Sequence, residues 1–255
     1  MKTRILTAIG ILSVIIPCLI FGGIFSELLI SLIVSIGTYE YVKLSLVKNN
    51  KLLTILLIIL ELIGLYLPKE LVLPYIGIIT MILLSLPIFS QTVKSSDIFL
   101  YISLVIFLII VGKAFREIYN TNSIYIWLII LATYACDTFA YFTGRFFGKH
   151  KLNERISPKK TIEGSIGGWF FGLLLTLGFW KLFMAKEQFV LALLSGIFLP
   201  IFGQLGDLAF SAIKRHFNIK DYGNLLPGHG GVLDRVDSLL FNLICFYFIF
   251  TLTNI

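Results

Sequence analysis

Residues 71–90 have the sequence LVLPYIGIITMILLSLPIFS, a run without a single charged side chain. A helix that crosses the hydrocarbon core of a bilayer needs about 20 predominantly apolar residues, so this run alone predicts a transmembrane helix. The rest of the chain has the same character, because 58% of its 255 residues are hydrophobic and 14% are charged, with a mean hydropathy of +0.95. Soluble domains carry roughly 25% charged residues, so a water-soluble globular fold is excluded.

Apolar runs bounded by charged or turn residues predict an all-α, polytopic integral membrane protein with about nine transmembrane helices. We expect these helices at residues 5–23, 24–42, 52–68, 71–90, 98–113, 123–143, 164–183, 188–211 and 238–254. The cysteines Cys18, Cys136 and Cys245 all fall in apolar stretches, which predicts reduced thiols that pack as small hydrophobic side chains.

The formal charge of +7 raises nucleic acid as a partner, but in a membrane protein an excess of Lys and Arg first indicates orientation. If the N-terminus is cytoplasmic, all but five of the 21 Lys and Arg residues fall in cytoplasmic segments. Those five are Lys69, Lys113, Arg116, Lys181 and Lys186. This distribution predicts that both charged loops of the C-terminal half, and a site built from them, face the cytoplasm, and it predicts no nucleic-acid partner.

The two halves of the chain differ in character. Residues 1–130 are nearly featureless apolar helices with short loops, which we interpret as a transmembrane scaffold and a place for dimer contacts. Residues 131–255 hold most of the Gly, charged and polar residues. We therefore expect the second half to be a catalytic transmembrane region with two cytoplasmic loops.

Acidic side chains in membrane helices are costly and normally mark a functional site. Asp137 lies in the apolar segment LATYACDTFAYFTGRFFG, and Asp207 lies in PIFGQLGDLAFSAIKRHF. Helical spacing puts Asp207, Ser211 and Lys214 on one face, with Arg215 beside them. That face offers a carboxylate, a hydroxyl and two cations. The alternative interpretation is a polar helix end whose bases reach for the membrane interface.

The loop that follows this helix has the sequence KDYGNLLPGHGGVLDRVDS. Lys220 and Asp221 open the loop. Gly230 and Gly231 allow backbone conformations and a close approach to a ligand that other residues do not. His229 between two glycines either orients a phosphate or serves as a plain turn residue.

Two further acids, Asp234 and Asp237, are three residues apart, so both can face one site, with Arg235 turned aside. Capping of a helix N-terminus is the structural alternative for Asp237. Carboxylates without a Cys or His cluster suit a hard divalent ion such as Mg²⁺, and surrounding bases suit phosphate oxygens. Together these residues predict a polyphosphate site.

The loop of residues 144–163 carries a second group of bases, which either attract anionic lipid or bind substrate. They are Arg145, Lys149, Lys151, Arg155, Lys159 and Lys160. We expect a turn at Ser157-Pro158. Because Lys159 and Lys160 are expected at headgroup level, their predicted task is to draw in an anionic substrate, whereas Lys214 is expected nearer the reacting centre.

The segment SAIKRHFNIKDYGNLLPGHGGVLDRVD, residues 211–237, resembles the signature of the phosphatidate cytidylyltransferases, also called CDP-diacylglycerol synthases. It has the Ser-x-x-Lys-Arg opening, the Lys-Asp pair, the Pro-x-His-Gly-Gly turn and the Asp-Arg-x-Asp close. The segments DTFAYFTGRFFGKHKL and SPKKTIEGSIGG are similar to upstream segments of that family. The resemblance covers residues 131–240 in detail and residues 1–130 in general character.

The resemblance implies a homodimeric, all-helical membrane enzyme that makes CDP-diacylglycerol and pyrophosphate from CTP and phosphatidate. It implies metal binding by Asp207 and Asp234, with Mg²⁺ essential and a monovalent cation such as K⁺ beside it. Asp137 joins the metal set by position and charge. The residues expected in catalysis are Lys214, Arg215, Lys220, Asp221, His229, Arg235 and Asp237. The residues expected to bind substrate are Ser211, Gly230, Gly231, Arg145, Lys159 and Lys160.

Two other functions fit parts of the pattern. A secondary transporter also buries acids, but around a midplane pocket rather than crowded with bases at one face. A CTP-dependent kinase of a lipid alcohol shares nucleotide, metal and membrane, but it attacks the γ-phosphorus and releases CDP. Glu40 and Glu61 lie in apolar runs outside these motifs, and we expect them to form hydrogen bonds inside the helix bundle.

Overall fold

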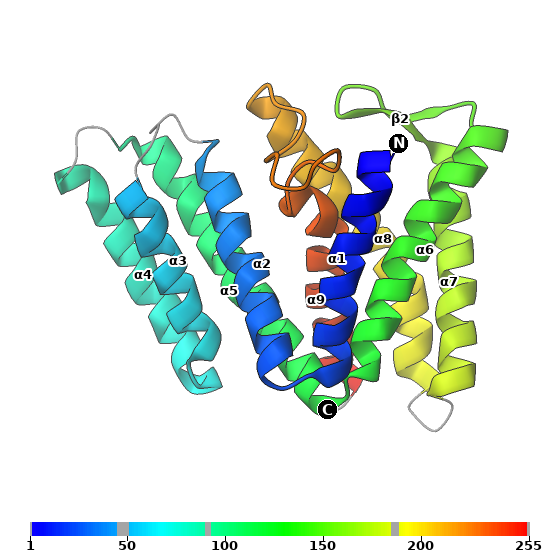
Figure 1. Ribbon diagram of the computed structural model, residues 1–255, viewed down its shortest axis with the longest axis horizontal. Coiled ribbons are helices and arrows are strands. Elements are labelled where there is room, and N and C mark those ends of the chain that lie inside the picture. Colours follow the sequence, from blue (N-terminus) through cyan, green and yellow to red (C-terminus); the bar gives the residue numbers. More distant parts are fainter. Residues whose placement is uncertain (1, 45–50, 90–92, 185–188, 254–255) are drawn as a thin grey trace. The chain divides into compact units, whose positions relative to one another are not determined.

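The computed structural model describes residues 2–44, 51–89, 93–184 and 189–253, and these ranges are mostly helical (Figure 1). The helices are α1 (Lys2–Phe21), α2 (Ile24–Val42), α3 (Lys51–Tyr66), α4 (Lys69–Phe89), α5 (Ser95–Thr121), α6 (Ile124–Phe147), α7 (Ile162–Phe183), α8 (Phe189–His216) and α9 (Leu233–Thr253). Strands β1 (Lys151–Asn153) and β2 (Ser157–Thr161) form an antiparallel hairpin between α6 and α7. The hairpin is a departure from the all-α prediction.

Seven of the described helices are long and apolar enough to cross a membrane, namely α2 and α4 to α9. Helix α3 has 16 residues and is therefore about 24 Å long, which is short for a hydrocarbon core about 30 Å thick. The apolar part of α1, Ile5–Phe21, is also short. The chain is thus an integral membrane protein, but nine crossings stay a prediction. The three cysteines are free, as predicted.

Helix α5 extends well past residue 113, where we expected it to end. The predicted end rested on the charges of Lys113 and Arg116, but both side chains have partners within the protein. Arg116 donates to the Glu27 carboxylate of α2 at 2.7 Å, and Lys113 donates to a backbone carbonyl that follows α3. Because these charges are compensated, the helix continues to Thr121.

Helix α9 begins at Leu233, five residues before the predicted start at 238. Asp234 therefore lies in its first turn, and Asp237 lies inside the helix rather than at its mouth. The physical reason is a distant cap: the Glu40 carboxylate accepts hydrogen bonds from backbone N–H groups at the start of α9.

The chain forms two compact units. Unit 1 comprises Met1–Arg116 and Asp221–Arg235, and unit 2 comprises Glu117–Lys220 and Val236–Ile255. Part of the loop that carries the family-like signature thus belongs to the same unit as the N-terminal helices. The functional division at residue 130 stays a prediction.

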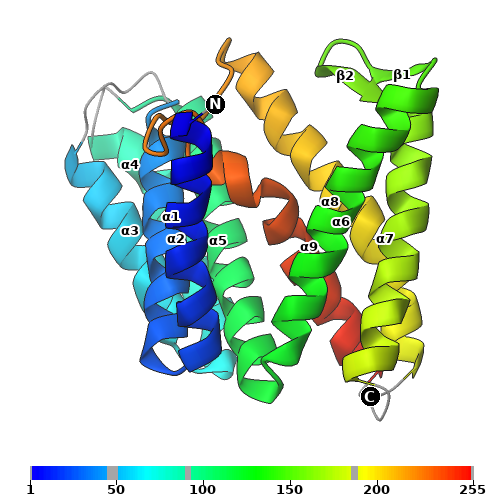
Figure 2. The same ribbon diagram turned by 45° about the vertical axis from the view of Figure 1, so that its right-hand side comes forward.

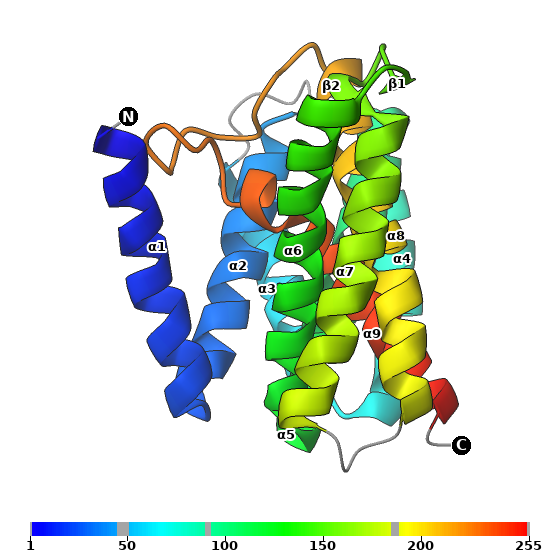
Figure 3. The ribbon, with the colours of Figure 1, turned by 90° about the vertical axis from the view of Figure 1, so that its right-hand side faces the viewer.

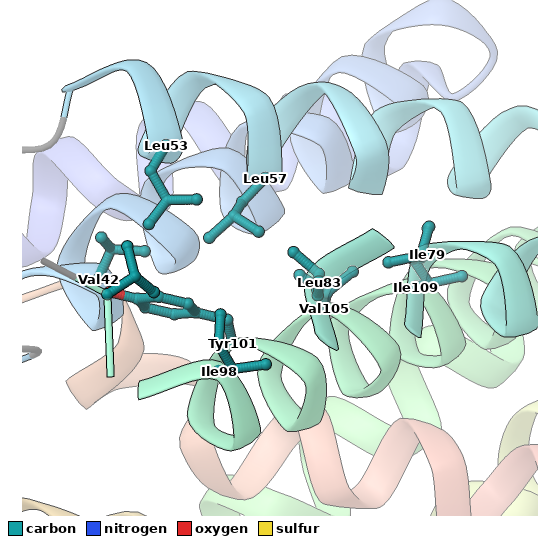
Figure 4. Packing of buried hydrophobic residues seen from close by; sticks show 10 residues of the cluster. Val42, Leu53, Leu57, Ile79, Leu83, Ile98, Tyr101, Val105 and Ile109 are labelled. Atoms are coloured by element: carbon teal, nitrogen blue, oxygen red, sulfur yellow. The ribbon is translucent and has the colours of Figure 1, made fainter. Parts of the chain in front are cut away.

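The core of unit 1 lies among α2, α3, α4 and α5. Figure 4 shows Leu57, Leu83 and Val105 among the side chains that converge there, and all three are fully buried. Small residues let the helices approach, since a β-carbon at Gly64 would lie 2.7 Å from Ile109 Cδ1. Close packing of this kind is the main source of helix association in membranes, because lipid tails are as apolar as the side chains.

One acid lies within this core. Glu61 of α3 is fully buried, and its carboxyl group is hydrogen-bonded to the hydroxyl of Thr38 on α2. The expectation that Glu61 makes a hydrogen bond inside the bundle is confirmed.

In unit 2, α6 and α7 run side by side (Figure 3) because glycines remove the side chains between them. A β-carbon at Gly168 would lie 2.7 Å from the carbonyl oxygen of Cys136, and one at Gly164 would lie 2.7 Å from the carbonyl oxygen of Ala140. Any larger residue at these positions would force the helices apart. The glycines therefore fix the spacing of the two helices that frame the β-hairpin.

The β-hairpin follows α6 directly and leads into α7 (Figure 2). Its turn lies at residues 154–156, where the Asn153 side chain accepts the backbone N–H of Ile156 at 3.1 Å, and not at Ser157-Pro158 as predicted. Glu163 ties the hairpin to α7, because its carboxylate accepts the backbone N–H groups of Lys149 and His150. The basic loop of the sequence is thus a defined structure.

Candidate functional site

A cavity of about 350 Å³ lies in unit 2 among α6, the β-hairpin, α7 and α8. Its lining contains side chains of both charges together with small polar groups. The lining residues are Asp137, Ala140, Tyr141, Gly144, Arg145, Lys159, Lys160, Thr161, Gly164, Ser165, Gln204 and Asp207. Five predicted site residues of this unit, two acids and three bases, thus border one cavity. Such a mixture suits a phosphorylated ligand accompanied by a cation.

An ion pair in the cavity joins β2 to α8. Lys160 Nζ lies 2.5 Å from Asp207 Oδ2, and both side chains are half-buried. On the other side, the Ser211 hydroxyl donates to Asp207 Oδ1 at 3.2 Å, which confirms the pair predicted from helical spacing. Lys160 was expected in a loop at headgroup level, and its depth in the membrane stays a prediction. Its contact with Asp207 was not predicted, and it arises because β2 returns from the hairpin turn and brings the lysine to α8.

Further charges surround Asp207. Asp137 of α6 interacts electrostatically with both Asp207 and Lys160. The buried Asp237 interacts with Asp207, Asp137 and Lys214. Three carboxylates, those of Asp137, Asp207 and Asp237, thus lie near two ammonium groups, and Arg145 and Lys159 of the lining add two further positive charges.

The oxygen donors of this cluster fit a hard cation such as Mg²⁺, which keeps waters and takes one or two carboxylates. Within the described ranges, however, no three His, Cys, Asp or Glu side chains come close enough together to hold a metal ion by themselves. A cation held here would therefore need further oxygen ligands from water or from a phosphate.

The start of α7 forms one wall of the cavity. Thr161 is the N-cap of α7, and its hydroxyl accepts the backbone N–H of Gly164 at 3.1 Å. The same hydroxyl would lie 2.8 Å from a β-carbon at Gly144, so α6 passes close to this cap. The first turn of α7 is thereby fixed against α6, with Ser165 at the cavity wall.

Sequence reasoning missed Ser165 and Gln204. Their side chains are hydrogen-bonded to each other, and Gln204 Nε2 also donates to the Ser165 carbonyl oxygen at 3.2 Å. The available signal was an uncharged polar residue, Gln204, in the apolar run PIFGQLGD. An amide or hydroxyl carries a smaller penalty in a membrane helix than a charge, so it draws less attention.

An apolar groove of about 310 Å³ adjoins the charged cavity, and Ser165 and Gln204 line both. Its other lining residues are hydrophobic: Leu152, Ile166, Trp169, Ile201, Leu205 and Leu208. Trp169 is held in place by a hydrogen bond from its indole N–H to the Ile197 carbonyl oxygen at 3.0 Å. Unit 2 therefore places a charged cavity and an apolar groove side by side.

In unit 1, residues 221–235 form the signature turn. The Asp234 carboxylate closes it, because Oδ2 accepts the backbone N–H groups of Tyr222 at 2.8 Å and Gly231 at 2.9 Å. Arg235 Nε donates to the His229 carbonyl oxygen at 2.9 Å. Gly230 has φ of 86°, a conformation that glycine adopts without strain. Two predicted site residues, Asp234 and Arg235, thus shape the turn that carries the others.

The predicted residues fall into two groups. Unit 2 holds Asp137, Arg145, Lys159, Lys160, Asp207, Ser211, Lys214, Arg215, Lys220 and Asp237, and the signature turn of unit 1 holds Asp221, His229, Gly230, Gly231, Asp234 and Arg235. Arg215 and Lys220 are exposed and do not line the cavity, and Arg215 donates to the Ile219 carbonyl oxygen at 2.8 Å. Lys214 is buried.

Comparison with known proteins identifies the family of this chain. A model of the cytidylyltransferase family matches residues 2–253. The chain belongs to the cytidylyltransferase family. This cytidylyltransferase is 39% identical over 254 residues to the phosphatidate cytidylyltransferase of Staphylococcus epidermidis, with 95% of this chain and 96% of that protein covered. It is 37% identical to the Staphylococcus aureus protein of the same name at the same coverage, and 39% identical over 251 residues to the Staphylococcus haemolyticus protein, again with 95% and 96% covered.

The two hairpin lysines of this cytidylyltransferase should behave differently. Lys160 contacts Asp207, so Lys160→Met should lower the rate of cytidylyl transfer at saturating substrate about 10-fold or more, at every ionic strength. Lys159 is exposed, so Lys159→Met should raise the apparent KM, and its defect should shrink as salt is added. Steady-state rates of the folded variants, isolated by size exclusion, measure both effects. Equal, salt-sensitive KM effects in the two variants would assign Lys160 to long-range attraction only.

Proposed function

We propose that this cytidylyltransferase transfers the cytidylyl group of CTP to phosphatidate, giving CDP-diacylglycerol and pyrophosphate. The observation that carries the proposal is the charged cavity that shares Ser165 and Gln204 with an apolar groove. A phosphate attached to acyl chains needs charged groups for its head and apolar surface for its tails. The name of the three staphylococcal relatives points to the same lipid.

The main obstacle to the reaction is the electrostatic repulsion between two anionic substrates. The attacking phosphate oxygen of phosphatidate is already an anion, so it needs no strong general base. It forms a bond to the α-phosphorus of CTP while the bond from that phosphorus to the pyrophosphate oxygen breaks. Arg145, Lys159 and Lys160 line the cavity and supply charge-assisted hydrogen bonds to the phosphate oxygens that would otherwise repel each other.

We assign the remaining charged groups supporting roles in this proposal. Buried Lys214 interacts electrostatically with Asp237 and binds phosphate close to the reacting centre. Ser211 orients Asp207 through their hydrogen bond. The other residues bind or position substrate from the ends of their elements: Arg215, Lys220, Asp221, His229, Gly230, Gly231 and Arg235.

Mg²⁺ is the proposed cofactor, with a monovalent cation such as K⁺ beside it. Asp137 and Asp207 in unit 2, and Asp234 on the signature turn, are the proposed ligands. The support is the grouping of the Asp137, Asp207 and Asp237 carboxylates and the preference of Mg²⁺ for oxygen donors. When bound, the metal neutralises charge on the nucleotide and on the departing pyrophosphate. Lys160 then has to share Asp207 with the metal.

Asp207→Asn tests the metal assignment. The amide keeps an oxygen that accepts from Ser211, so the fold should survive, but the charge is lost. We expect activity to fall about 100-fold or more and the Mg²⁺ concentration for half-maximal rate to rise. Asp97→Asn, which alters a buried acid of α5 in unit 1, is the control and should leave the Mg²⁺ dependence unchanged. An unchanged Mg²⁺ requirement in Asp207→Asn would remove Asp207 from the metal site.

A cytoplasmic site in the bacterial inner membrane completes the proposal, because CTP is a cytosolic nucleotide and the Lys and Arg residues are distributed as the positive-inside rule requires. We also propose a homodimer with contacts in residues 1–130, on the resemblance alone.

Orientation can be measured with single cysteines in a variant whose native cysteines are replaced. Glu154 of the hairpin turn and Asn224 of the signature turn are exposed, so cysteines there should react with a membrane-impermeant reagent only after the cytoplasmic face is opened. Ser123, exposed between α5 and α6, is the matched control and should be labelled in intact cells. Labelling of residue 154 or 224 from outside would contradict the cytoplasmic site.

Product analysis decides between the proposed reaction and its rivals. Purified protein with Mg²⁺, phosphatidate and CTP labelled in the cytosine ring should yield a lipid-soluble labelled product and one pyrophosphate per turnover. A lipid-alcohol kinase would instead release labelled CDP into water and transfer the γ-phosphate. A transporter would consume no CTP. Either of the last two results, with phosphatidate and a lipid alcohol both supplied, would overturn the proposal.

A further inference from the structure

The buried acid Glu40 has no assigned task, although it links α2 directly to the signature turn. Its side chain is 1% exposed. One carboxylate oxygen accepts the backbone N–H of Val232 and the other accepts that of Leu233, each at 2.9 Å. All of these residues belong to unit 1.

Local structure does not favour an acid at this position. Glu40 lies in the last turn of α2, where the helix dipole presents its negative end. The start of α9 presents the opposite situation, since its first N–H groups lack partners in the helix and carry partial positive charge. The carboxylate is therefore unfavourable for α2 and favourable for α9. An acid that is unfavourable for its own helix but caps another helix is best explained by the segment that it holds in place.

The turn is shaped to receive this carboxylate. A β-carbon at Gly223 would lie 2.6 Å from Glu40 Oε1, and one at Gly231 would lie 2.5 Å from Oε2. Both positions therefore need glycine for Glu40 to reach the backbone. The Tyr222 ring also stacks on the Tyr41 ring, next to Glu40 on α2, with centroids 6.1 Å apart.

The groups that follow these two amides are those expected to act on substrate. Asp234 comes directly after Leu233, and its carboxylate binds the N–H groups of Tyr222 and Gly231. Arg235 follows and holds the His229 carbonyl oxygen. The hydrogen bonds to Glu40 therefore fix the backbone from which the Asp234 and Arg235 side chains extend.

We propose that Glu40 is a positioning residue for cytidylyl transfer, which holds the signature turn in its active arrangement by capping α9 from α2. The proposal rests on the proposed function for its catalytic consequence. It extends the catalytic apparatus into residues 1–130, which the sequence indicated as a scaffold and a place for dimer contacts.

Glu40→Gln tests this role with little change in shape. The amide keeps one acceptor oxygen but turns an NH₂ group toward the second backbone N–H, so the start of α9 should loosen. Because a displacement of about 1 Å can cost about 100-fold in rate, we expect kcat per folded enzyme to fall roughly 10- to 100-fold, more than KM rises. Deuterium exchange of the full-length enzyme in detergent should be faster in peptides that cover residues 221–235.

Glu27→Gln is the matched control, because Glu27 is another acid of α2, at the opposite end of the helix, in an ion pair with Arg116 at 2.7 Å. It should lower thermal stability but leave kcat and exchange at the signature turn unchanged. A purely structural Glu40 would behave in the same way as Glu27, with fewer folded molecules of normal kcat. That result would overturn the proposal.

Gly223→Ala disturbs the same contact by a change in the signature turn instead of in Glu40. It provides a second test when Glu40→Gln fails to fold. Its methyl group meets Glu40 Oε1, so kcat should fall and exchange at the turn should rise, both less than in Glu40→Gln. Faster exchange with normal kcat would overturn the positioning role. Wild-type protein without cytidylyl transfer would instead overturn the proposed function, while the exchange comparison would still report whether Glu40 holds the turn.

Discussion

A charge placed inside an apolar helix bundle has to be compensated on the spot, and this requirement organises both units. In unit 1, Arg116 compensates Glu27 and so allows α5 to continue beyond its expected end. In unit 2, Lys160 compensates Asp207 and so brings β2 onto α8. Removing one member of such a pair leaves the other half-buried and without this partner, which is unfavourable. The charged residues therefore act as structural constraints before they act on any substrate.

Glycines determine how closely these charges can approach. Gly164 and Gly168 let α6 and α7 come into near contact. This close approach brings Asp137 of α6 and Ser165 of α7 to the lining of the same cavity. Ser165 also lines the apolar groove, so the surface changes from charged to apolar at this residue. In the proposed function, the charged head of the lipid binds in the cavity and its apolar tails lie in the groove. A free nucleotide would be unfavourable in the apolar groove, because its charged phosphates would lose water there without gaining polar partners.

Hydropathy was sufficient to locate the helices, because a run such as residues 71–90 has no alternative in a membrane. It failed at the ends of α5 and α9, where distant partners decide how far the helix extends. For the site, the spacing of Asp207 and Ser211 was enough, since both lie on one helix. The contact from Lys160 was not predictable, because it depends on where a β-hairpin folds back, and no periodicity within one element encodes that.

The cap on α9 has a consequence for biosynthesis. Glu40 is 192 positions ahead of Val232, whose backbone N–H donates a hydrogen bond to its carboxylate. At roughly 5–20 residues per second, about 10 to 40 seconds pass between the synthesis of the acid and the arrival of the amides it binds. During that interval the Glu40 carboxyl group lacks the two amides that it binds in the folded protein. The link between α2 and the start of α9 therefore forms only after the ribosome has delivered residues 232 and 233.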